Sequence, residues 1–261
     1  MTPQFGTRID VSQIRQSFST GSGEVVALQE INLTIEPGAF VSFLGPSGCG
    51  KSTLMRIVTG LLAATSGEVR LNGEVVDGPQ TDLGIVFQQP ILMDWRTVLG
   101  NVMLQTDLRG RPGHDYRARA ESLIEQVGLK DFMHLYPRSL SGGMRQRVSI
   151  CRALLHNPPM IVMDEPFGAL DALTREQMRI DLEQLWLNGR KTVIFITHSI
   201  DEAVLLSDRV YVFTPRPGQI DRIIPIDLPR PRGFAARESP EVARHVKEIN
   251  EIFLARGVFH T

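Results

Sequence analysis

Short apolar runs alternate with amphipathic segments along most of the chain. Four of these runs have the length of a strand and contain no charged residue: 39–44, 83–87, 160–163 and 192–196. An uninterrupted apolar run of this length is typical of a strand that is buried on both faces. Between the runs lie segments with helical spacing, such as 172–188. The pattern therefore predicts an α/β fold with a mostly parallel sheet covered by helices.

Two regions depart from this alternation. Near the N-terminus, residues 8–14 and 31–35 read as strands around a polar loop, 19–24, and residues 69–76 form a hairpin around Asn72-Gly73. Asn-Gly is the typical pair for a tight hairpin turn. The sequence thus predicts an antiparallel β region before the parallel sheet is complete.

In the second region, residues 89–158, only helices are expected. They cover 97–104, 114–127 and 144–155. We interpret 89–158 as a helical subdomain inserted into the α/β core, within a first domain of residues 8–233.

The C-terminal part begins after a last hairpin, 210–226, and a linker rich in proline and arginine, 229–232. Ser239 and Pro240 are typical of a helix start, and one face of this helix is apolar. That face carries Val242, Val246, Ile249 and Phe253. We treat 234–261 as a C-terminal linker and helix, whose role beyond packing on the core stays open.

Composition and charge exclude several classes of protein. The 261 residues have a net charge of −1 and no polybasic run, so nothing in the charge indicates a nucleic-acid partner. The two cysteines do not suggest a disulfide framework, and a reducing cytosol fits them. Residues 1–12 do not read as a secretory signal, and no run reaches the roughly 18 apolar residues that a membrane span needs.

The strongest chemical signal is a glycine-rich loop between the apolar run 39–44 and a helical segment. It reads Gly45, Pro46, Ser47, Gly48, Cys49, Gly50, Lys51, Ser52, Thr53. Such a loop turns successive backbone N–H groups toward one anion, at the positive end of a helix. Lys51 can then bind terminal phosphates, and the Ser52 hydroxyl can bind Mg²⁺. A chance glycine-rich turn is the alternative, and the flanking strand and helix favour a nucleoside-triphosphate site.

Polar side chains follow three other apolar runs. Asp164 and Glu165 follow 160–163, Gln88 follows 83–87, and His198 follows 192–196. Ligands of α/β sheets bind at these strand ends. There a carboxylate can hold Mg²⁺ and a second one can deprotonate an attacking water. Two solvated acids, a loop glutamine and a structural histidine are the alternatives, and the phosphate loop upstream favours function for the two acids.

A second anion-binding pattern lies at 140–147, Leu-Ser-Gly-Gly-Met-Arg-Gln-Arg. It places the Ser141 hydroxyl, Gly142 and Gly143 at a helix start, where free N–H groups attract phosphate. One chain cannot easily bring two such helix starts onto one γ-phosphate, whereas two chains placed head to tail can. The pattern therefore predicts a dimer.

Taken together, these motifs resemble the ATP-binding subunit of an ABC transporter. The resemblance covers about residues 8–232 and rests on the order and spacing of six motifs: 45–52, Gln88, 140–147, 160–165, Gly168–Asp171 and His198. It implies a P-loop NTPase (RecA-like) core, ATP and Mg²⁺ as ligands, and a homodimer that closes on ATP and reopens after hydrolysis.

The resemblance also implies roles for individual residues. Residues 45–53 would hold the phosphates, Glu165 would be the general base, and His198 would hold the γ-phosphate and the attacking water. Ser52, Gln88 and Asp164 would serve Mg²⁺. The signature residues Ser141, Gly142, Gly143 and Gln146 would contact the opposite copy's nucleotide, and Asp171 would link the two sites. Phe18 would stack on adenine, although the family more often has Tyr there and the ring could simply cap the sheet.

A narrower likeness is to importers for nitrate, sulfonates, taurine and similar small molecules. It rests on 45–54, 95–102 and 163–175, with departures at Met93-Asp94 and Ala39. It implies a transmembrane permease as partner, a periplasmic or lipid-anchored substrate-binding protein, and a peripheral place on the cytoplasmic face of the inner membrane. Trp95 would lie in a groove that accepts a permease helix, or else in the core of the helical subdomain.

Two alternatives concern the function itself. The first is a soluble ABC-type ATPase that acts on DNA or ribosomes. DNA-repair members carry a long coiled coil before the signature, whereas 51 residues separate Gln88 from Leu140 here. The second is a regulatory binder that does not hydrolyse ATP, and Glu165 and His198 speak against it.

Overall fold

The six-stranded sheet at the centre of the molecule is mostly parallel. The computed structural model describes residues 6–21, 23–110 and 114–258. The order of the strands is β10-β9-β3-β8-β7-β6, with parallel pairing throughout except between β9 and β10. Their bounds are β3 (Phe40–Leu44), β6 (Gly84–Val86), β7 (Met160–Asp164), β8 (Thr192–Thr197), β9 (Arg209–Phe213) and β10 (Ile220–Pro225). The predicted α/β fold is confirmed.

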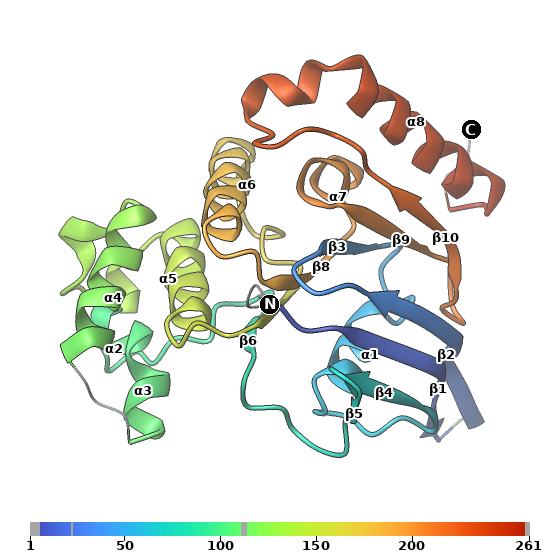
Figure 1. The fold of residues 1–261 in the computed structure, drawn as a ribbon, viewed down its shortest axis with the longest axis horizontal. Coiled ribbons are helices and arrows are strands. Elements are labelled where there is room, and N and C mark those ends of the chain that lie inside the picture. The colour runs from blue at the N-terminus through green and yellow to red at the C-terminus, as the bar shows by residue number, and fades with distance from the viewer. Residues whose placement is uncertain (1–5, 22, 111–113, 259–261) are drawn as a thin grey trace, which may run out of the picture.

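A second sheet of four antiparallel strands lies beside the first (Figure 1). In the order β2-β1-β4-β5, it contains β1 (Ile9–Thr20), β2 (Gly23–Ile35), β4 (Ser66–Leu71) and β5 (Glu74–Val75). Between β4 and β5, Asn72 and Gly73 have φ angles of 50° and 87°. The hairpin predicted at this pair is therefore confirmed, with the left-handed backbone that such a turn needs.

The first two strands are longer than the sequence indicated. Pairing between β1 and β2 continues to Thr20 and Gly23, so the polar loop predicted over 19–24 is wrong in its extent. The register shifts three times along the pair, and Gln13 and Glu30 have left-handed φ angles of 50° and 52°. Each irregularity moves side chains to the other face of the strand, which breaks the alternation that identifies a strand in a sequence.

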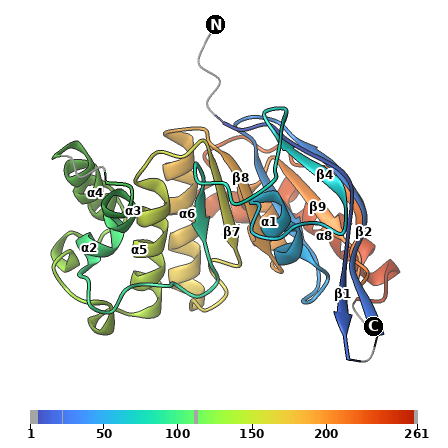
Figure 2. The same cartoon turned by 90° about the horizontal axis from the view of Figure 1, so that it is seen from below.

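Helix α1 (Lys51–Val58) packs between the two sheets, as Figure 2 shows. Its apolar side chains Leu54, Met55 and Val58 are buried in one cluster with residues of β1, β2, β3 and β9. The helix starts immediately after the phosphate loop. Packing from both sides therefore fixes the direction in which its N-terminus points.

The chain between β6 and β7 is helical, as predicted. It forms α2 (Val98–Val102), α3 (Leu104–Leu108), α4 (His114–Gln126), two short 3-10 helices, Lys130–Phe132 and Pro137–Ser139, and α5 (Gly142–Leu154). The single helix predicted over 97–104 is wrong in its extent, because α2 ends and α3 begins at Met103.

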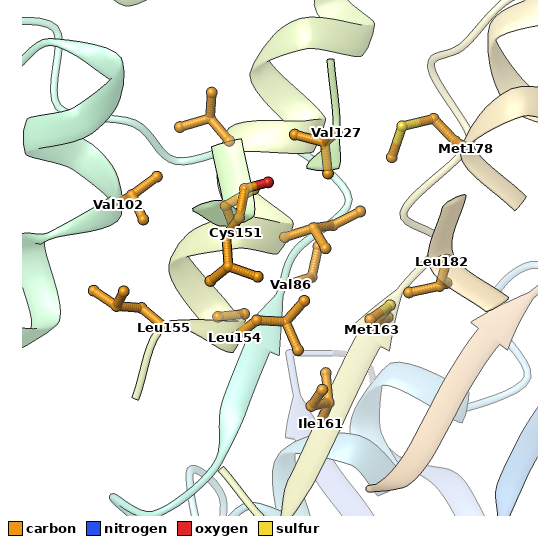
Figure 3. Close-up of a cluster of buried hydrophobic side chains, with 14 of the residues drawn as sticks. Val86, Val102, Val127, Cys151, Leu154, Leu155, Ile161, Met163, Met178 and Leu182 are labelled. Atoms are coloured by element: carbon orange, nitrogen blue, oxygen red, sulfur yellow. The ribbon is translucent and has the colours of Figure 1, made fainter. Parts of the chain in front are cut away.

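These helices share a core with the large sheet. Side chains of α2, α4 and α5 pack in one apolar cluster with β6, β7 and α6 (Ala172–Leu187), shown in Figure 3. Val102 and Cys151 lie on the helical side of this cluster, and Val86, Met163 and Leu182 lie on the other. Burial raises the pKa of the Cys151 thiol to about 12, so this cysteine stays a neutral core residue.

The C-terminal helix covers the other side of the sheet. Helix α8 (Pro240–Ala255) packs on α7 (Ile200–Leu206) through an apolar cluster that includes Val242, Ile249 and Phe253. Ser239 accepts a hydrogen bond of 3.2 Å from Val242 N and so caps the helix as predicted. A further 3-10 helix, Phe234–Glu238, precedes α8. The range 234–261 stays a predicted unit, and its residues 259–261 lie outside the described part.

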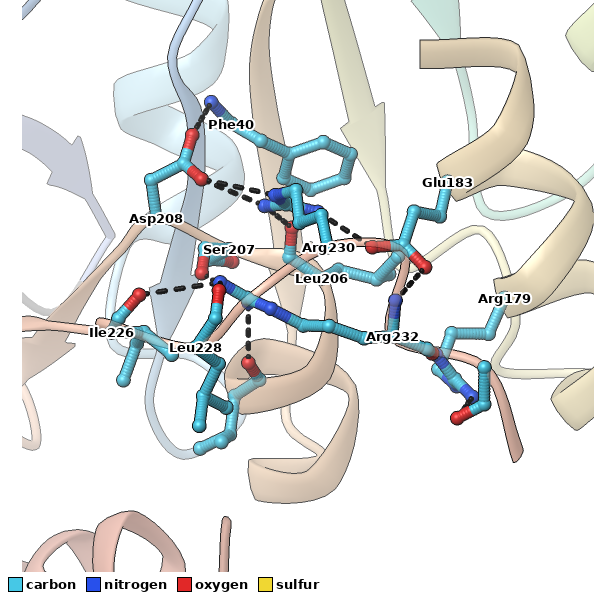
Figure 4. Close-up of polar contacts among 12 residues, drawn as sticks. Phe40, Arg179, Glu183, Leu206, Ser207, Asp208, Ile226, Leu228, Arg230 and Arg232 are labelled. Carbon is cyan, nitrogen blue, oxygen red and sulfur yellow. Dashed lines mark hydrogen bonds and ion pairs between the residues drawn. The ribbon is translucent and has the colours of Figure 1, made fainter. Parts of the chain in front are cut away.

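The linker before α8 is tied to the core by the half-buried Arg230 and the buried Arg232 (Figure 4). Arg230 donates to Glu183 (3.0 Å) and to Asp208 (2.8 Å). The Arg232 guanidinium donates to four carbonyl oxygens, of Val204, Ser207, Ile226 and Leu228. Burial lowers the pKa of Arg232 to about 10, which still leaves it charged at neutral pH.

None of the described helices is both long and apolar enough to cross a bilayer.

Candidate active site

The phosphate loop joins β3 to α1. Gly48 and Gly50 have φ angles of 77° and 100°, and a Cβ on Gly50 would lie 2.6 Å from Leu28 Cδ2. Glycine is therefore required at position 50 by both backbone and space. The Lys51 ammonium is held inside the loop, where it donates to Gly45 O (2.8 Å) and Pro46 O (3.0 Å). Its charge lies where the N–H groups of the helix start converge, so the loop concentrates positive potential at one point.

Asp164 at the end of β7 meets Ser52 in α1. The Ser52 hydroxyl donates a hydrogen bond of 2.9 Å to Asp164 Oδ1, across 112 positions of sequence. Burial raises the pKa of Asp164, although this hydrogen bond and the charge of Lys51 act in the opposite direction. A hydroxyl and a carboxylate at this spacing are oxygen donors of the kind that Mg²⁺ prefers.

The carboxylate of Glu165, the next residue, is contacted by two side chains. The Glu165 backbone N–H donates to Ile196 O (2.9 Å), which ties this residue to β8, and its φ angle is 45°. Gln88 Nε2 donates to its Oε2 at 3.2 Å, and His198 Nδ1 lies 3.4 Å from the same oxygen. The structure thus brings together the side chains predicted at the ends of three different strands, β6, β7 and β8.

Gln88 and Glu165 face a cavity of about 370 Å³, whereas Asp164 and His198 are not among its lining residues. Phosphate-loop residues and strand-end side chains line it: Phe18, Ser47, Gly48, Gly50, Lys51, Ser52, Thr53, Gln88, Glu165 and Arg216. Gly45, Pro46 and Cys49 are not among the residues that line this cavity, and Cys49 is buried with its pKa raised by burial. Sequence reasoning missed Arg216, whose only signal was a Pro-Arg-Pro-Gly turn after an apolar strand.

Phe18 lines the same cavity from β1, with 40% of its surface exposed. Strand β1 continues to Thr20, so Phe18 lies inside the strand and does not end it. Its open ring face beside the phosphate loop offers a planar apolar surface, which is what a base needs for stacking.

The signature residues lie elsewhere on the molecule, at the start of α5. Ser141 caps this helix and accepts 3.3 Å from Met144 N. Gly142 is exposed, and Gly143 packs so closely on α6 that a Cβ would lie 2.6 Å from Thr174 Cγ2. None of Ser141, Gly142, Gly143 or Gln146 is among the described residues that line the cavity. Within one chain the two anion-binding helix starts are therefore separate.

Comparison with known proteins identifies the family. A family model described as ABC transporter matches residues 28–168, which is more than half of the chain and contains both helix starts. The chain belongs to the ABC transporter family. It is an ATP-binding ATPase subunit with a P-loop NTPase fold, as the resemblance implied.

Named relatives are similar over most of the chain. An aliphatic sulfonates import ATP-binding protein of Bacillus licheniformis is 44% identical and covers 86% of both chains. A taurine import ATP-binding protein of Roseobacter denitrificans is 46% identical over 83% of this chain and 81% of its own. A nitrate import ATP-binding protein of a Synechocystis species is 41% identical over 97% of both.

Solved structures give the same result. A dimeric bacterial ABC transporter cassette superposes with a TM-score of 0.75 at 35% identity and covers 84% of this chain and 98% of its own. A post-hydrolysis dimer of the same cassette, bound to ADP and Pi, has a TM-score of 0.74 at 34% identity.

The exposure of two residues of this ABC ATPase bears on the roles predicted for them. Gln146 is only 2% exposed and donates to Phe87 O at 3.3 Å. The side chain braces α5 against the segment that leads to Gln88, and its predicted contact with a second copy's nucleotide stays a prediction. Trp95 is 75% exposed, so the alternative that it is a core residue is wrong.

Asp171 and Glu202 hold the loops beside the site. Asp171 caps α6, and its hydrogen bond from Thr174 N (3.0 Å) accompanies a lowered pKa of this carboxyl. Ser199 caps α7 by accepting from Glu202 N (3.4 Å), and the Glu202 carboxylate accepts from Thr197 Oγ1 at 2.5 Å. This contact fixes the residues on both sides of His198.

Proposed function

We propose that the chain is the energy-coupling subunit of an ABC importer for a small molecule such as nitrate, a sulfonate or taurine. The three relatives named above support this class of substrate. The observation that carries the ATPase chemistry is that Gln88 and Glu165 line one cavity with the phosphate loop, while His198, which is not among the lining residues, contacts the Glu165 carboxylate. No observation favours the alternative of an ATPase acting on DNA or ribosomes.

In the proposed mechanism the phosphate loop binds ATP through its backbone N–H groups, and Phe18 stacks on the adenine. Lys51 exchanges its two carbonyl acceptors for the terminal phosphates, which are stronger partners because they are charged. The hydroxyl of Ser52 and the carboxylate of Asp164 would hold Mg²⁺, and the side-chain amide oxygen of Gln88 would be a further ligand. When bound, this ion supplies positive charge against the β- and γ-phosphates.

Glu165 is the proposed general base. Its carboxylate faces the cavity and is held by Gln88 on one side and His198 on the other. A carboxylate held in this way can take the proton of a water positioned in line with the γ-phosphate. Gln88 and His198 orient that water and the γ-phosphate, next to the loop and the base that already line the cavity.

The proposed functional unit is a homodimer. The signature at Ser141–Gly143 and the phosphate loop are separate within one chain, and each is an anion-binding helix start. A second copy in the opposite orientation would complete each site. The similarity to a dimeric cassette supports this arrangement.

The proposed membrane partner is a separate permease at the cytoplasmic face of the inner membrane. A largely exposed tryptophan, Trp95, lies between the strand end at Gln88 and α2, and exposed aromatic side chains are typical of contact surfaces. We propose that it receives a short permease helix, and that a substrate-binding protein delivers the molecule to that permease.

Reconstitution tests this proposal. The chain is expressed with a permease of this importer class, and release of phosphate and uptake into vesicles are measured. Lys51→Ala should bind no ATP and support no uptake. Trp95→Ala should keep the ATPase activity of the isolated chain but no longer bind the permease. The control Phe234→Ala, which removes another exposed aromatic side chain (64%), should keep both the activity and the binding. Co-purification with ribosomes or DNA and not with membranes would contradict the importer assignment.

A further inference from the structure

The turn between β9 and β10 carries a positive charge to the rim of the nucleotide cavity. It reads Thr214-Pro215-Arg216-Pro217-Gly218. Arg216 lines the cavity together with Phe18 and Lys51. Its Nε donates to Gly48 O in the phosphate loop at 3.4 Å, across 168 positions of sequence. No motif in the sequence pointed to this residue.

The structure holds this turn in a fixed place. Gly218 N donates to Ala27 O (2.9 Å) and Gln29 N donates to Gly218 O (3.0 Å), so the turn is joined to β2. A Cβ at position 218 would lie 1.9 Å from Cys49 O, which means that the turn touches the phosphate loop backbone directly. Arg216 is thus presented by a segment that is packed against both walls of the cavity.

The guanidinium has the properties of a group waiting for an anion. Within the described part of the chain it pairs with no carboxylate, and its one recorded hydrogen bond is long and goes to a neutral carbonyl. A planar guanidinium prefers phosphate oxygens and can bind two of them at once. Lys51, the other cation that lines the cavity among the described residues, is in α1 and approaches from a different element.

We propose that Arg216 is a nucleotide ligand, whose guanidinium binds a phosphate oxygen of ATP from the β9–β10 turn. This inference rests on the proposed position of ATP in the cavity. It adds a second cation, from outside the phosphate loop, to the recognition of the polyphosphate.

Equilibrium titration with Mg-ATP, Mg-ADP and adenosine tests the proposal in four proteins. These are the parent, Arg216→Ala, Arg216→Lys and the control Arg222→Ala, which removes an exposed arginine from the neighbouring strand β10. The Kd for Mg-ATP should rise about tenfold in Arg216→Ala, which is the effect of losing one charge-assisted hydrogen bond at an open site. Arg216→Lys should recover part of this loss, and Arg222→Ala should match the parent.

Two readouts separate a ligand from a structural brace. The binding of adenosine and the Tm of the nucleotide-free protein should be the same in Arg216→Ala and the parent. If both fall together with ATP affinity, Arg216 only supports the loop and the proposal is overturned. A Kd for Mg-ATP within twofold of the parent overturns it as well.

Lys51→Ala separates this inference from the one on which it rests. Loss of ATP binding in Lys51→Ala with normal binding in Arg216→Ala would remove only the role of Arg216. Normal ATP binding in Lys51→Ala would show that ATP does not bind at the phosphate loop and would overturn both.

Discussion

Nδ1 of His198 lies 3.4 Å from Oε2 of Glu165, the oxygen that also accepts a hydrogen bond from Gln88. One oxygen of the carboxylate at the end of β7 thus contacts side chains from the ends of β6 and β8, the two strands that flank β7. This arrangement holds the proposed general base in place without a nucleotide. The parallel sheet aligns the three strand ends that carry Gln88, Glu165 and His198.

Removal of the base should separate binding from hydrolysis. In Glu165→Gln the amide occupies the same space but cannot accept a proton from water. We expect release of phosphate to fall by about 100-fold or more while the Kd for Mg-ATP stays within a few-fold of the parent. Gel filtration with Mg-ATP should show a dimer that persists. Normal turnover would mean that another group is the base.

Acidification should weaken the Mg-dependent reaction earlier than an ordinary aspartate would. Burial raises the pKa of Asp164, so protons compete with Mg²⁺ at this carboxylate at a higher pH than usual. The pKa is raised on folding, so this group stabilises the nucleotide-free fold at low pH, and that stabilisation is lost as pH rises through the folded-state pKa.

Asp164→Asn tests both effects of this carboxyl, on the Mg-dependent reaction and on the stability of the nucleotide-free fold. The amide oxygen can still accept from Ser52, so the nucleotide-free protein at neutral pH should melt at the parent temperature or about 2 °C higher. Hydrolysis dependent on Mg²⁺ should be lost. A clear fall of Tm in Asp164→Asn would show that the ionised carboxylate stabilises the fold.

The linker contacts should contribute strongly to stability. Glu183 is buried and accepts from Arg230 Nη1 (3.0 Å) and from the backbone N of Arg232 (2.7 Å). Glu183→Ala leaves a buried guanidinium without this partner and should lower the free energy of unfolding by about 3 kcal/mol. The control Glu121→Ala breaks a surface pair with Arg117 and should cost about 0.5 kcal/mol. Equal losses in urea titrations would contradict the role of the buried pair.

Gln146 should affect the fold more than the nucleotide. Gln146→Ala removes a buried side chain and the donor to Phe87 O, so the free energy of unfolding should fall by about 2 kcal/mol. ATP-dependent dimerisation, measured in the Glu165→Gln background below the melting temperature, should persist. Loss of the dimer without loss of stability would instead support a direct contact with the second copy.

The sequence predicted the parts of this molecule that depend on local pattern. The buried strands at 160–163 and 192–196 and the phosphate loop were recognised because apolar runs and fixed spacing are visible in any window of the chain. The long β1–β2 hairpin was not, because its irregular register disrupts the alternation. Arg216 was missed because its approach to Gly48 depends on how a distant turn packs on β2. The environment of Gln146 depends on the rotation of α5, which spacing alone does not give.

The left-handed backbone of Glu165 has a cost that glycine would not incur. A non-glycine residue at a φ of 45° is about 1 kcal/mol less favourable than glycine there. Selection for thermal stability alone would therefore favour glycine at this position. The resulting protein would be more stable but would not hydrolyse ATP. The acid in that conformation therefore lowers folding stability slightly, which fits its proposed role as the general base.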